Sequence, residues 1–368
     1  MYEKNLLFKL VFSCLSVLAV LFLIAQIYGE SEIEYSDNKF NPKLNLHATS
    51  INNTSFPQQY TDNPMGKDVN SDIEKAVIIM FDRGYNTQFT NAKPILDKYG
   101  FKASFFVICS FIDGEGYYDL SKGKEFFRSV VDLEPMRWNE IKTLDDEGHD
   151  VQSHGMNHRY LRNLSSDDIE NEIEGSKQCI EEQNLKPTFF QVPFNRGADN
   201  STILNMISKH FDFALSGHSE LMFLNCDGWQ HGFKTRSYKY QHDCNPFSAD
   251  GTPTRTHKYA IREWSQDRLH EKMNEENPLL RPHGDEISNM VFTEFVRIVE
   301  AQHLYNSKAG KIVAVPIIGY HSIGNSRPFD TSTELFDREM KYLYTNGFKV
   351  LKMTDLGYNE KENYFYIK

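Results

Sequence analysis

The sequence has no excess of positive charge. Of its 368 residues, 51 are Asp or Glu and 40 are Lys or Arg, which gives a formal net charge of −11. Proteins that bind nucleic acid neutralise its phosphates with Lys and Arg, and an acidic chain is repelled by them. The composition therefore argues against nucleic acid as a partner.

Cysteine is scarce, and no two cysteines have the close paired spacing of a zinc site. Of the five cysteines, Cys14 lies in an apolar N-terminal run, which leaves Cys109, Cys179, Cys226 and Cys244 with three possible pairings. Cys226 and Cys244 flank a polar, aromatic loop, so we favour them as a disulfide if the domain is outside the cell. Four reduced, packed thiols are the alternative.

A clean small-x-small cleavage site is missing before Gly29. The preceding residues 11–28 are almost uninterruptedly apolar and long enough to span a bilayer. Lys4 and Lys9 precede this run, so the positive-inside rule places the bulk of the chain outside. We favour a retained single-pass anchor in the cell membrane over a cleaved signal peptide, which would make the protein secreted.

No internal repeat is present, and strand-like runs alternate with helix-like segments. We expect strands at residues 77–81, 102–108, 149–152, 188–191, 211–215, 258–263 and 312–318. We expect helices at residues 87–99, 137–147, 286–303 and 334–346, and one that begins after Ser165 as its N-cap. This alternation predicts an α/β fold with a parallel sheet.

The run Val-Ile-Ile-Met-Phe at residues 77–81 ends abruptly in Asp82, Arg83 and Gly84. Five consecutive apolar residues indicate a strand that is buried on both faces, as in a parallel sheet. Asp82 would then lie at the C-terminal end of the strand, where α/β folds carry their chemistry. The alternative is an ordinary strand followed by a turn, in which Asp82 only caps the next segment.

Other chemically useful residues also follow short apolar runs. His154 and His158 come after the run at 149–152 and are four residues apart. If the turn between them is helical, both imidazoles lie on one face and can bind one cation. Capping or surface histidines are the alternative interpretation. Phe194 and His321 follow later runs in the same way.

Taken in order, these motifs resemble the polysaccharide deacetylase family, the NodB-homology domain of carbohydrate esterase family four. The resemblance covers roughly residues 75–358. It implies a distorted (β/α) barrel of the polysaccharide deacetylase type at residues 71–358. We expect one N-terminal transmembrane helix or signal peptide at residues 1–29 and a flexible linker at residues 30–70, which are rich in Asn, Ser, Thr and Pro.

The resemblance also implies a reaction, the hydrolysis of N-acetyl groups on an extracellular or cell-envelope glycan. A divalent metal, with zinc expected first, would assist the reaction. The implied general base is Asp82 and the implied general acid is His321. The implied metal ligands are His154 and His158, and the implied substrate-binding residues are Phe194 and Trp264. Another amide hydrolase, which would differ in pocket shape, remains a further alternative.

Arg83 departs from the family's pattern, which has an aspartate metal ligand at this position. A guanidinium cannot ligate a metal and stays charged. At ~4 Å from a dication it would cost several kcal/mol even at an effective dielectric of ~20. Gln191 also stands where many members have an arginine. These departures favour an alternative function, a catalytically weakened glycan-binding or envelope protein on the same fold.

Overall fold

The computed structural model describes residues 75–114, 134–197, 200–224, 257–277, 279–280, 284–324 and 330–368. The expected anchor and linker lie outside the described residues, as do Cys226 and Cys244. Within the described ranges, no helix combines the length and the apolar character that crossing a membrane requires. All of these ranges fall in one compact unit, Gly66–Lys368.

A closed barrel of seven parallel strands forms the centre of the part of the chain that the structure describes. In spatial order the strands are β1 (Lys75–Arg83), β2 (Ser104–Val107), β3 (Asp150–Ser153), β4 (Phe189–Gln191), β5 (Phe213–His218), β7 (Ile261–Ser265) and β9 (Ile317–Tyr320). The barrel closes because β9 pairs again with β1, with Ile78 beside Ile317 and Phe81 beside Tyr320. The expected parallel α/β barrel is therefore confirmed.

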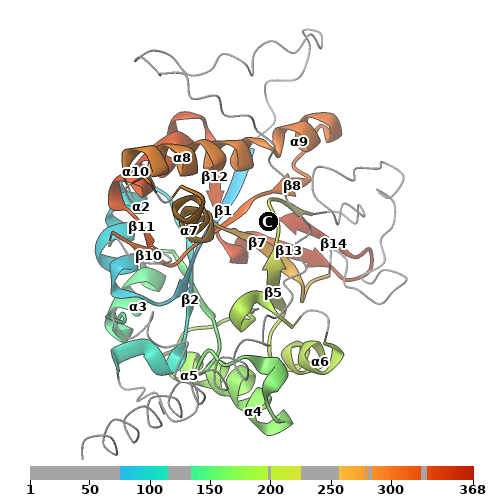
Figure 1. Cartoon of the computed structure of the whole chain (residues 1–368). Coiled ribbons are helices and arrows are strands. Elements are labelled where there is room, and N and C mark those ends of the chain that lie inside the picture. Colours follow the sequence, from blue (N-terminus) through green and yellow to red (C-terminus); the bar gives the residue numbers. More distant parts are fainter. Residues whose placement is uncertain are drawn as a thin grey trace, which may run out of the picture. The chain divides into compact units, whose positions relative to one another are not determined.

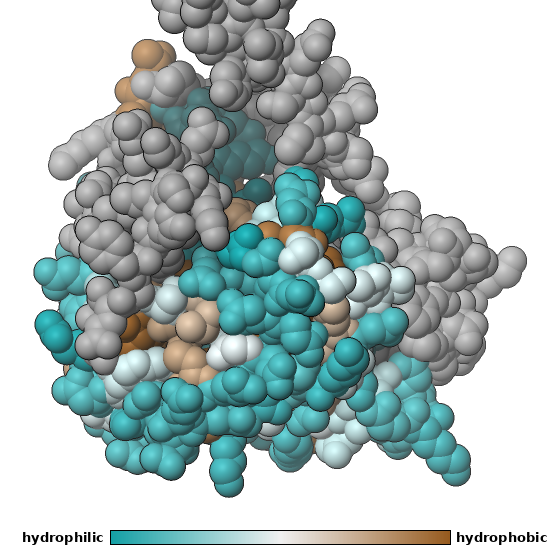
Figure 2. All heavy atoms as spheres, turned by 90° about the horizontal axis from the view of Figure 1, so that it is seen from below, coloured by the Kyte–Doolittle hydropathy of each residue, from teal (hydrophilic) through white to brown (hydrophobic). Residues whose placement is uncertain are grey.

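Helices cover the outside of the barrel (Figure 1). They are α2 (Lys93–Tyr99), α3 (Trp138–Asp146), α4 (Ser166–Glu170), α5 (Ser176–Glu181), α6 (Ser201–His210), α7 (Gln266–Glu276), α8 (Asp285–Glu300), α9 (His303–Ala309) and α10 (Thr333–Thr345). Figure 2 views the molecule from the side on which α4, α5 and α6 lie in Figure 1, and the described surface there is mainly hydrophilic.

Shorter elements complete the fold. β12 (Phe348–Leu351) pairs in parallel with the beginning of β1. The remaining strands form three small pairs: β6 (Met222–Phe223) with β8 (Ala314–Val315), β10 (Ser322–Ile323) with β11 (Asp330–Thr331), and β13 (Leu356–Asn359) with β14 (Tyr364–Ile367). Single 3₁₀ or π turns occur at η2 (Gln88–Ala92), η3 (Cys109–Gly114), η5 (Leu161–Asn163), η6 (Asn171–Gly175), η7 (Pro193–Asn195) and η10 (Met353–Asp355).

The continuous apolar run of β1 is explained by burial on both faces. Val77, Ile79 and Phe81 pack with residues of the surrounding helices in one core cluster. Ile78 and Met80 point the other way, into a second cluster inside the barrel. A strand whose side chains alternate between two apolar environments can tolerate no polar position. After Lys75 at the start of β1, the next polar side chain is therefore Asp82, at the strand end.

Gln88 fastens the barrel where β1 and β9 end. Its side chain is completely buried. The amide nitrogen Nε2 donates to the carbonyl oxygen of Asp82 at 2.6 Å and to that of His321 at 2.7 Å. Both carbonyls lie at the C-terminal edge of the barrel, one residue before the end of β1 and directly after β9. One amide group thus satisfies two buried acceptors and joins the first and last barrel strands.

Replacing Gln88 by Ala should destabilise the protein by about 1–3 kcal/mol, because two buried carbonyl oxygens lose their donor. Denaturant unfolding of the purified protein measures this change. The control is Thr90→Ala, at an exposed position of the same turn, which should change the unfolding free energy by less than about 0.5 kcal/mol. Equal effects of the two substitutions would contradict the fastening role of Gln88.

Candidate active site

Polar side chains gather where the barrel strands end, although they lie far apart in the sequence. Asp82 comes from β1 and Gln191 from β4, while His154 and His321 directly follow β3 and β9. Parallel strands bring their carboxyl ends to one edge of a barrel, which explains this convergence. Of the residues singled out in the sequence, Asp82, His154, His158, Phe194 and His321 are joined by contacts described below.

Asp82 is buried and has two neighbours in the site. Its Oδ2 accepts a hydrogen bond of 2.8 Å from Nε2 of Gln191 and lies 3.7 Å from Nε2 of His321. Its Oδ1 has no hydrogen-bond partner among the described residues. Burial raises the pKa of the Asp82 carboxyl, and the nearby His321 opposes that rise. A carboxylate in this environment is a stronger base than one in water.

His321 is held in place by Asp267, on the first turn of α7. Oδ2 of Asp267 lies 3.1 Å from Nδ1 of His321 and accepts the backbone N–H of His321 at 2.6 Å. Oδ1 of Asp267 accepts from the hydroxyl of Thr331 at 2.5 Å. A carboxylate at Nδ1 fixes the orientation of the imidazole, so Nε2 faces Asp82. The imidazole of His321 thus lies between two buried carboxyl groups, those of Asp82 and Asp267.

His154 and His158 lie side by side, with ring centroids 4.5 Å apart. The turn between them is not helical, and His158 has a φ of 54°. Nδ1 of His154 lies 3.1 Å from the backbone oxygen of Gln191, which leaves Nε2 as the acceptor nitrogen. Burial lowers the pKa of His154 to about 3, and burial, His154 and Arg83 lower that of His158. Both imidazoles are therefore neutral at physiological pH.

Arg83 is buried next to this pair and has a left-handed backbone, with a φ of 76°. Its Nη1 donates to the Tyr85 hydroxyl at 2.9 Å. Its positive charge nevertheless contributes to the lowered pKa of both histidines. A guanidinium that disfavours protonation of an imidazole also disfavours a cation bound to that imidazole.

The residues present do not fit the expected three-ligand metal site. Two neutral imidazoles are suitable ligands for zinc, but the third position is a cation. Among the described residues, only Glu170, Glu174 and His210 bring three potential ligand atoms within 4.8 Å of one another. They lie on the outer helical turns and not at the strand ends. We therefore assign no chemical step to a metal in the native chain.

Glu263 adds a second carboxyl group to the interior of the barrel. It is buried on β7, and its Oε1 accepts from Nδ2 of Asn195 at 2.8 Å and lies 3.6 Å from Nδ1 of His218. Gly319 on β9 packs so closely that a Cβ at that position would overlap with Oε2 of Glu263. Burial, together with the nearby Asp82 charge, raises the pKa of Glu263 to about 8. Glu263 is thus mainly protonated at neutral pH.

The two expected substrate-binding aromatics have different surroundings. Phe194 is 36% exposed and packs on His158 and Tyr160, with centroid distances of 4.8 and 5.9 Å. Trp264 is instead packed against the core cluster beneath the outer helices. It follows Glu263 on β7, and successive strand residues point to opposite faces. The structure therefore does not bring Trp264 to the site.

Sequence reasoning missed Asp267, Glu263 and Glu172. Asp267 lies in α7, a helix that the sequence did not predict because its apolar residues are sparse. Glu172 is a buried glutamate in a segment correctly expected to be helical. The only sequence signal for Glu263 was its place in an extended segment. Their contacts depend on tertiary packing.

The fold is an α/β barrel whose polar site lies at the C-terminal strand ends, the edge that carries chemistry in such barrels. Residues 70–211 match the family model described as polysaccharide deacetylase. The resemblance to the polysaccharide deacetylase family is therefore confirmed.

Relatives with curated names cover part of the chain. YxkH of Bacillus subtilis, whose name assigns it provisionally to the polysaccharide deacetylases, is 27% identical over 124 residues, 33% of this chain and 38% of its own length. A peptidoglycan-N-acetylglucosamine deacetylase of Bacillus cereus is 27% identical over 121 residues, 33% of this chain and 46% of its own. The chain thus spans less than half of the length of these two relatives. The solved peptidoglycan deacetylase PdaC from Bacillus subtilis is 14% identical, with a TM-score of 0.38 over 76% of this chain and 89% of its own.

Glu263→Gln should change the pH dependence of stability. The pKa of Glu263 is raised to about 8 from 4.5, so its stabilising contribution is complete below pH 4.5 and is lost as the pH rises through 8. Glutamine does not titrate. Between pH 6 and 9 the native chain should lose at least ~1 kcal/mol relative to the variant. Thermal unfolding at both pH values measures this, with the exposed Glu182→Gln as control. Parallel stability curves for Glu263→Gln and the native chain would refute the shift.

Proposed function

We propose that this protein is a polysaccharide deacetylase-like hydrolase that removes N-acetyl groups from a glycan, with an activity limited by Arg83. The observation that carries the proposal is the buried Asp82, 3.7 Å from a His321 imidazole that Asp267 orients. This pair supplies a base and an acid at one point of the barrel edge. The family resemblance and the name of the Bacillus cereus relative support a glycan as substrate.

The pair can carry both proton transfers of amide hydrolysis. Asp82 accepts a proton from the attacking water, whose oxygen adds to the acetyl carbon. The carbon–nitrogen bond then breaks, and His321 donates a proton to the leaving amine through Nε2. The products are acetate and a free amino sugar. General acid–base catalysis of this kind contributes about 10²–10⁴-fold to a rate.

Phe194 gives the site a surface for a sugar ring. It is 36% exposed and contacts His158, and the Tyr160 ring packs nearly perpendicular to it. An aromatic face at the rim offers apolar contact to a sugar while the N-acetyl group extends toward Asp82. A non-catalytic glycan-binding protein is the second candidate, and Arg83 is the observation that favours it.

Arg83→Asp tests the two candidates. The substitution removes a positive charge and adds an oxygen donor beside His154 and His158, so metal affinity and acetate release should both rise, the rate by about tenfold or more. Metal content of the purified protein and acetate released from acetylated chito-oligosaccharides are the measurements. In this background Asp82→Asn should abolish the gained activity and leave metal uptake in place, because Asp82 is assigned as the base.

The matched control is Arg137→Asp, the same charge change at an exposed position before α3. It should alter neither metal content nor rate. A native chain that already holds stoichiometric metal, at a rate that Arg83→Asp does not improve, would show our account of Arg83 to be wrong. Oligosaccharide binding without acetate release by either chain would favour the glycan-binding candidate.

We further propose that the domain faces the cell exterior and is anchored by the apolar residues 11–28. The Cys109–Cys179 disulfide supports this placement, because disulfides persist in oxidising compartments. Protease added to intact cells should degrade the domain, while membrane pellets retain the N-terminal segment. A soluble cytoplasmic pool of the full-length chain would overturn the proposal.

A further inference from the structure

The segment that joins His154 to His158 is held on one side by the chain after β2. The backbone N–H of Cys109 donates to the carbonyl oxygen of Gly155 at 3.2 Å, and that of Ser110 donates to Met156 at 3.0 Å. These bonds act on the carbonyl groups of the segment only. They leave the N–H groups of the same residues in need of acceptors.

Glu172 supplies acceptors for the N–H groups of Met156, Asn157 and Arg159 from the opposite side. Its Oε2 accepts the backbone N–H of Asn157 at 2.9 Å and that of Arg159 at 3.4 Å, and its Oε1 accepts Nδ2 of Asn157 at 2.9 Å. Its backbone oxygen accepts the N–H of Met156 at 3.1 Å. The side chain is completely buried, so no water competes for these bonds. Hydrogen bonds to a charged acceptor are about twice as strong as neutral ones.

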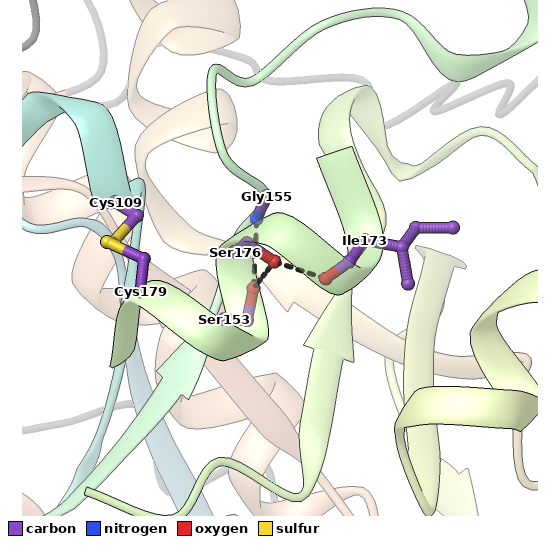
Figure 3. The surroundings of a disulfide bond; sticks show 6 residues. All are labelled: Cys109, Ser153, Gly155, Ile173, Ser176 and Cys179. Carbon is purple, nitrogen blue, oxygen red and sulfur yellow. Dashed lines mark hydrogen bonds between the residues drawn. A yellow bond between two sulfur atoms is a disulfide. The ribbon is translucent and has the colours of Figure 1, made fainter. Parts of the chain in front are cut away.

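A disulfide connects the two sides. Cys109 is bonded to Cys179 on α5, and α5 continues directly from η6, which carries Glu172 (Figure 3). Figure 3 also shows the hydroxyls of Ser153 and Ser176, 2.7 Å apart, with Ser153 accepting the N–H of Gly155 at 3.2 Å. The segment from Gly155 to His158 therefore lies between two supports that are covalently linked to each other.

We propose that Glu172 is a positioning residue that, together with the Cys109–Cys179 disulfide, forms one clamp fixing His154 and His158 in the site. The carboxylate holds the N–H side of the segment, the backbone of Cys109 and Ser110 holds the carbonyl side, and the disulfide sets their separation. Only the role of the two histidines in the reaction rests on the proposed function. The clamp itself is a statement about their positions.

The chemistry of the clamp requires a carboxylate. Three N–H groups point at the two oxygens of Glu172. A glutamine of the same shape would turn an N–H₂ group toward one of these donors, and that bond would be lost. Glu172→Gln therefore weakens the clamp on one side while keeping the volume of the side chain.

Hydrogen exchange of the Asn157 and Arg159 amides, whose N–H groups the Glu172 carboxylate accepts, tests the proposal in the full chain. Glu172→Gln should speed their exchange by about tenfold or more, because the charged acceptor is lost. The matched control is Glu174→Gln, two residues along the same turn, whose side chain accepts from Gln178 at 3.0 Å on the surface. The control should leave both amides unchanged. Equal exchange in the two variants would overturn the proposal.

Removal of the disulfide provides a second, independent test. Replacing both Cys109 and Cys179 by Ser should also speed exchange at Asn157 and Arg159. If the supports form one clamp, the effects of Glu172→Gln and of the cysteine substitutions should be strongly non-additive. Additive effects would show two separate supports and refute the single clamp. Should Glu172→Gln fail to fold, the cysteine arm alone decides, because unchanged exchange without the disulfide contradicts the proposal.

Imidazole signals separate positioning from general destabilisation. In ¹H–¹⁵N spectra, Glu172→Gln should shift the ring signals of His154 and His158 and leave those of His149 in place. A shift of all three would indicate a merely structural role and overturn the positioning assignment. In the Arg83→Asp background the variant should lower kcat with little change in KM. Absence of acetate release from any variant would count against the proposed function, whereas the exchange and imidazole results would still decide the clamp.

Discussion

The pairing of β1 with both β2 and β9 is the constraint on which the rest of the structure depends. It closes the barrel, and it requires that β1 be apolar on both faces until its last residues. Asp82 and His321 become neighbours only because the first and last strands of the ring end beside each other. Gln88 donates to the carbonyl groups of both residues. The contacts that close the barrel therefore also fix the relative positions of Asp82 and His321.

Burial determines the charge of the site more than any single partner does. It lowers the pKa of His154 to about 3 and raises that of Glu263 to about 8, so these groups are neutral near pH 7. Arg83 keeps its charge in the same surroundings because a guanidinium is not deprotonated in proteins. The site thus combines the neighbouring Asp82 and His321, which we propose as base and acid, with a cation beside two ligand-type histidines. The Asp82–His321 pair supports the proposed hydrolysis, and the positive charge of Arg83 supports the proposed weak metal binding.

The sequence predicted those elements whose signals are local. The run at 77–81 became β1, Gly100 ends α2 with a φ of 71°, and Ser165 caps α4 by accepting the N–H of Asp168. Helices α6, α7 and α9 were missed, and with α7 the orienting Asp267. The Cys109–Cys179 bond joins residues 70 positions apart, so no local pattern could reveal it, and it excludes four reduced cysteines. Trp264 was placed by resemblance, but the alternation of β7 directs it to the opposite face from Glu263.

The close approach of Gly319 to Glu263 links the variability of two positions that are 56 residues apart in number and adjacent in space. A side chain at 319 requires that the carboxyl end of Glu263 shifts or that a shorter residue stands at 263, and a shorter residue removes the protonated carboxyl group from the barrel interior. In any remodelling of this pocket, by natural drift or by design, the side chains that position 319 accepts therefore depend on the residue at position 263.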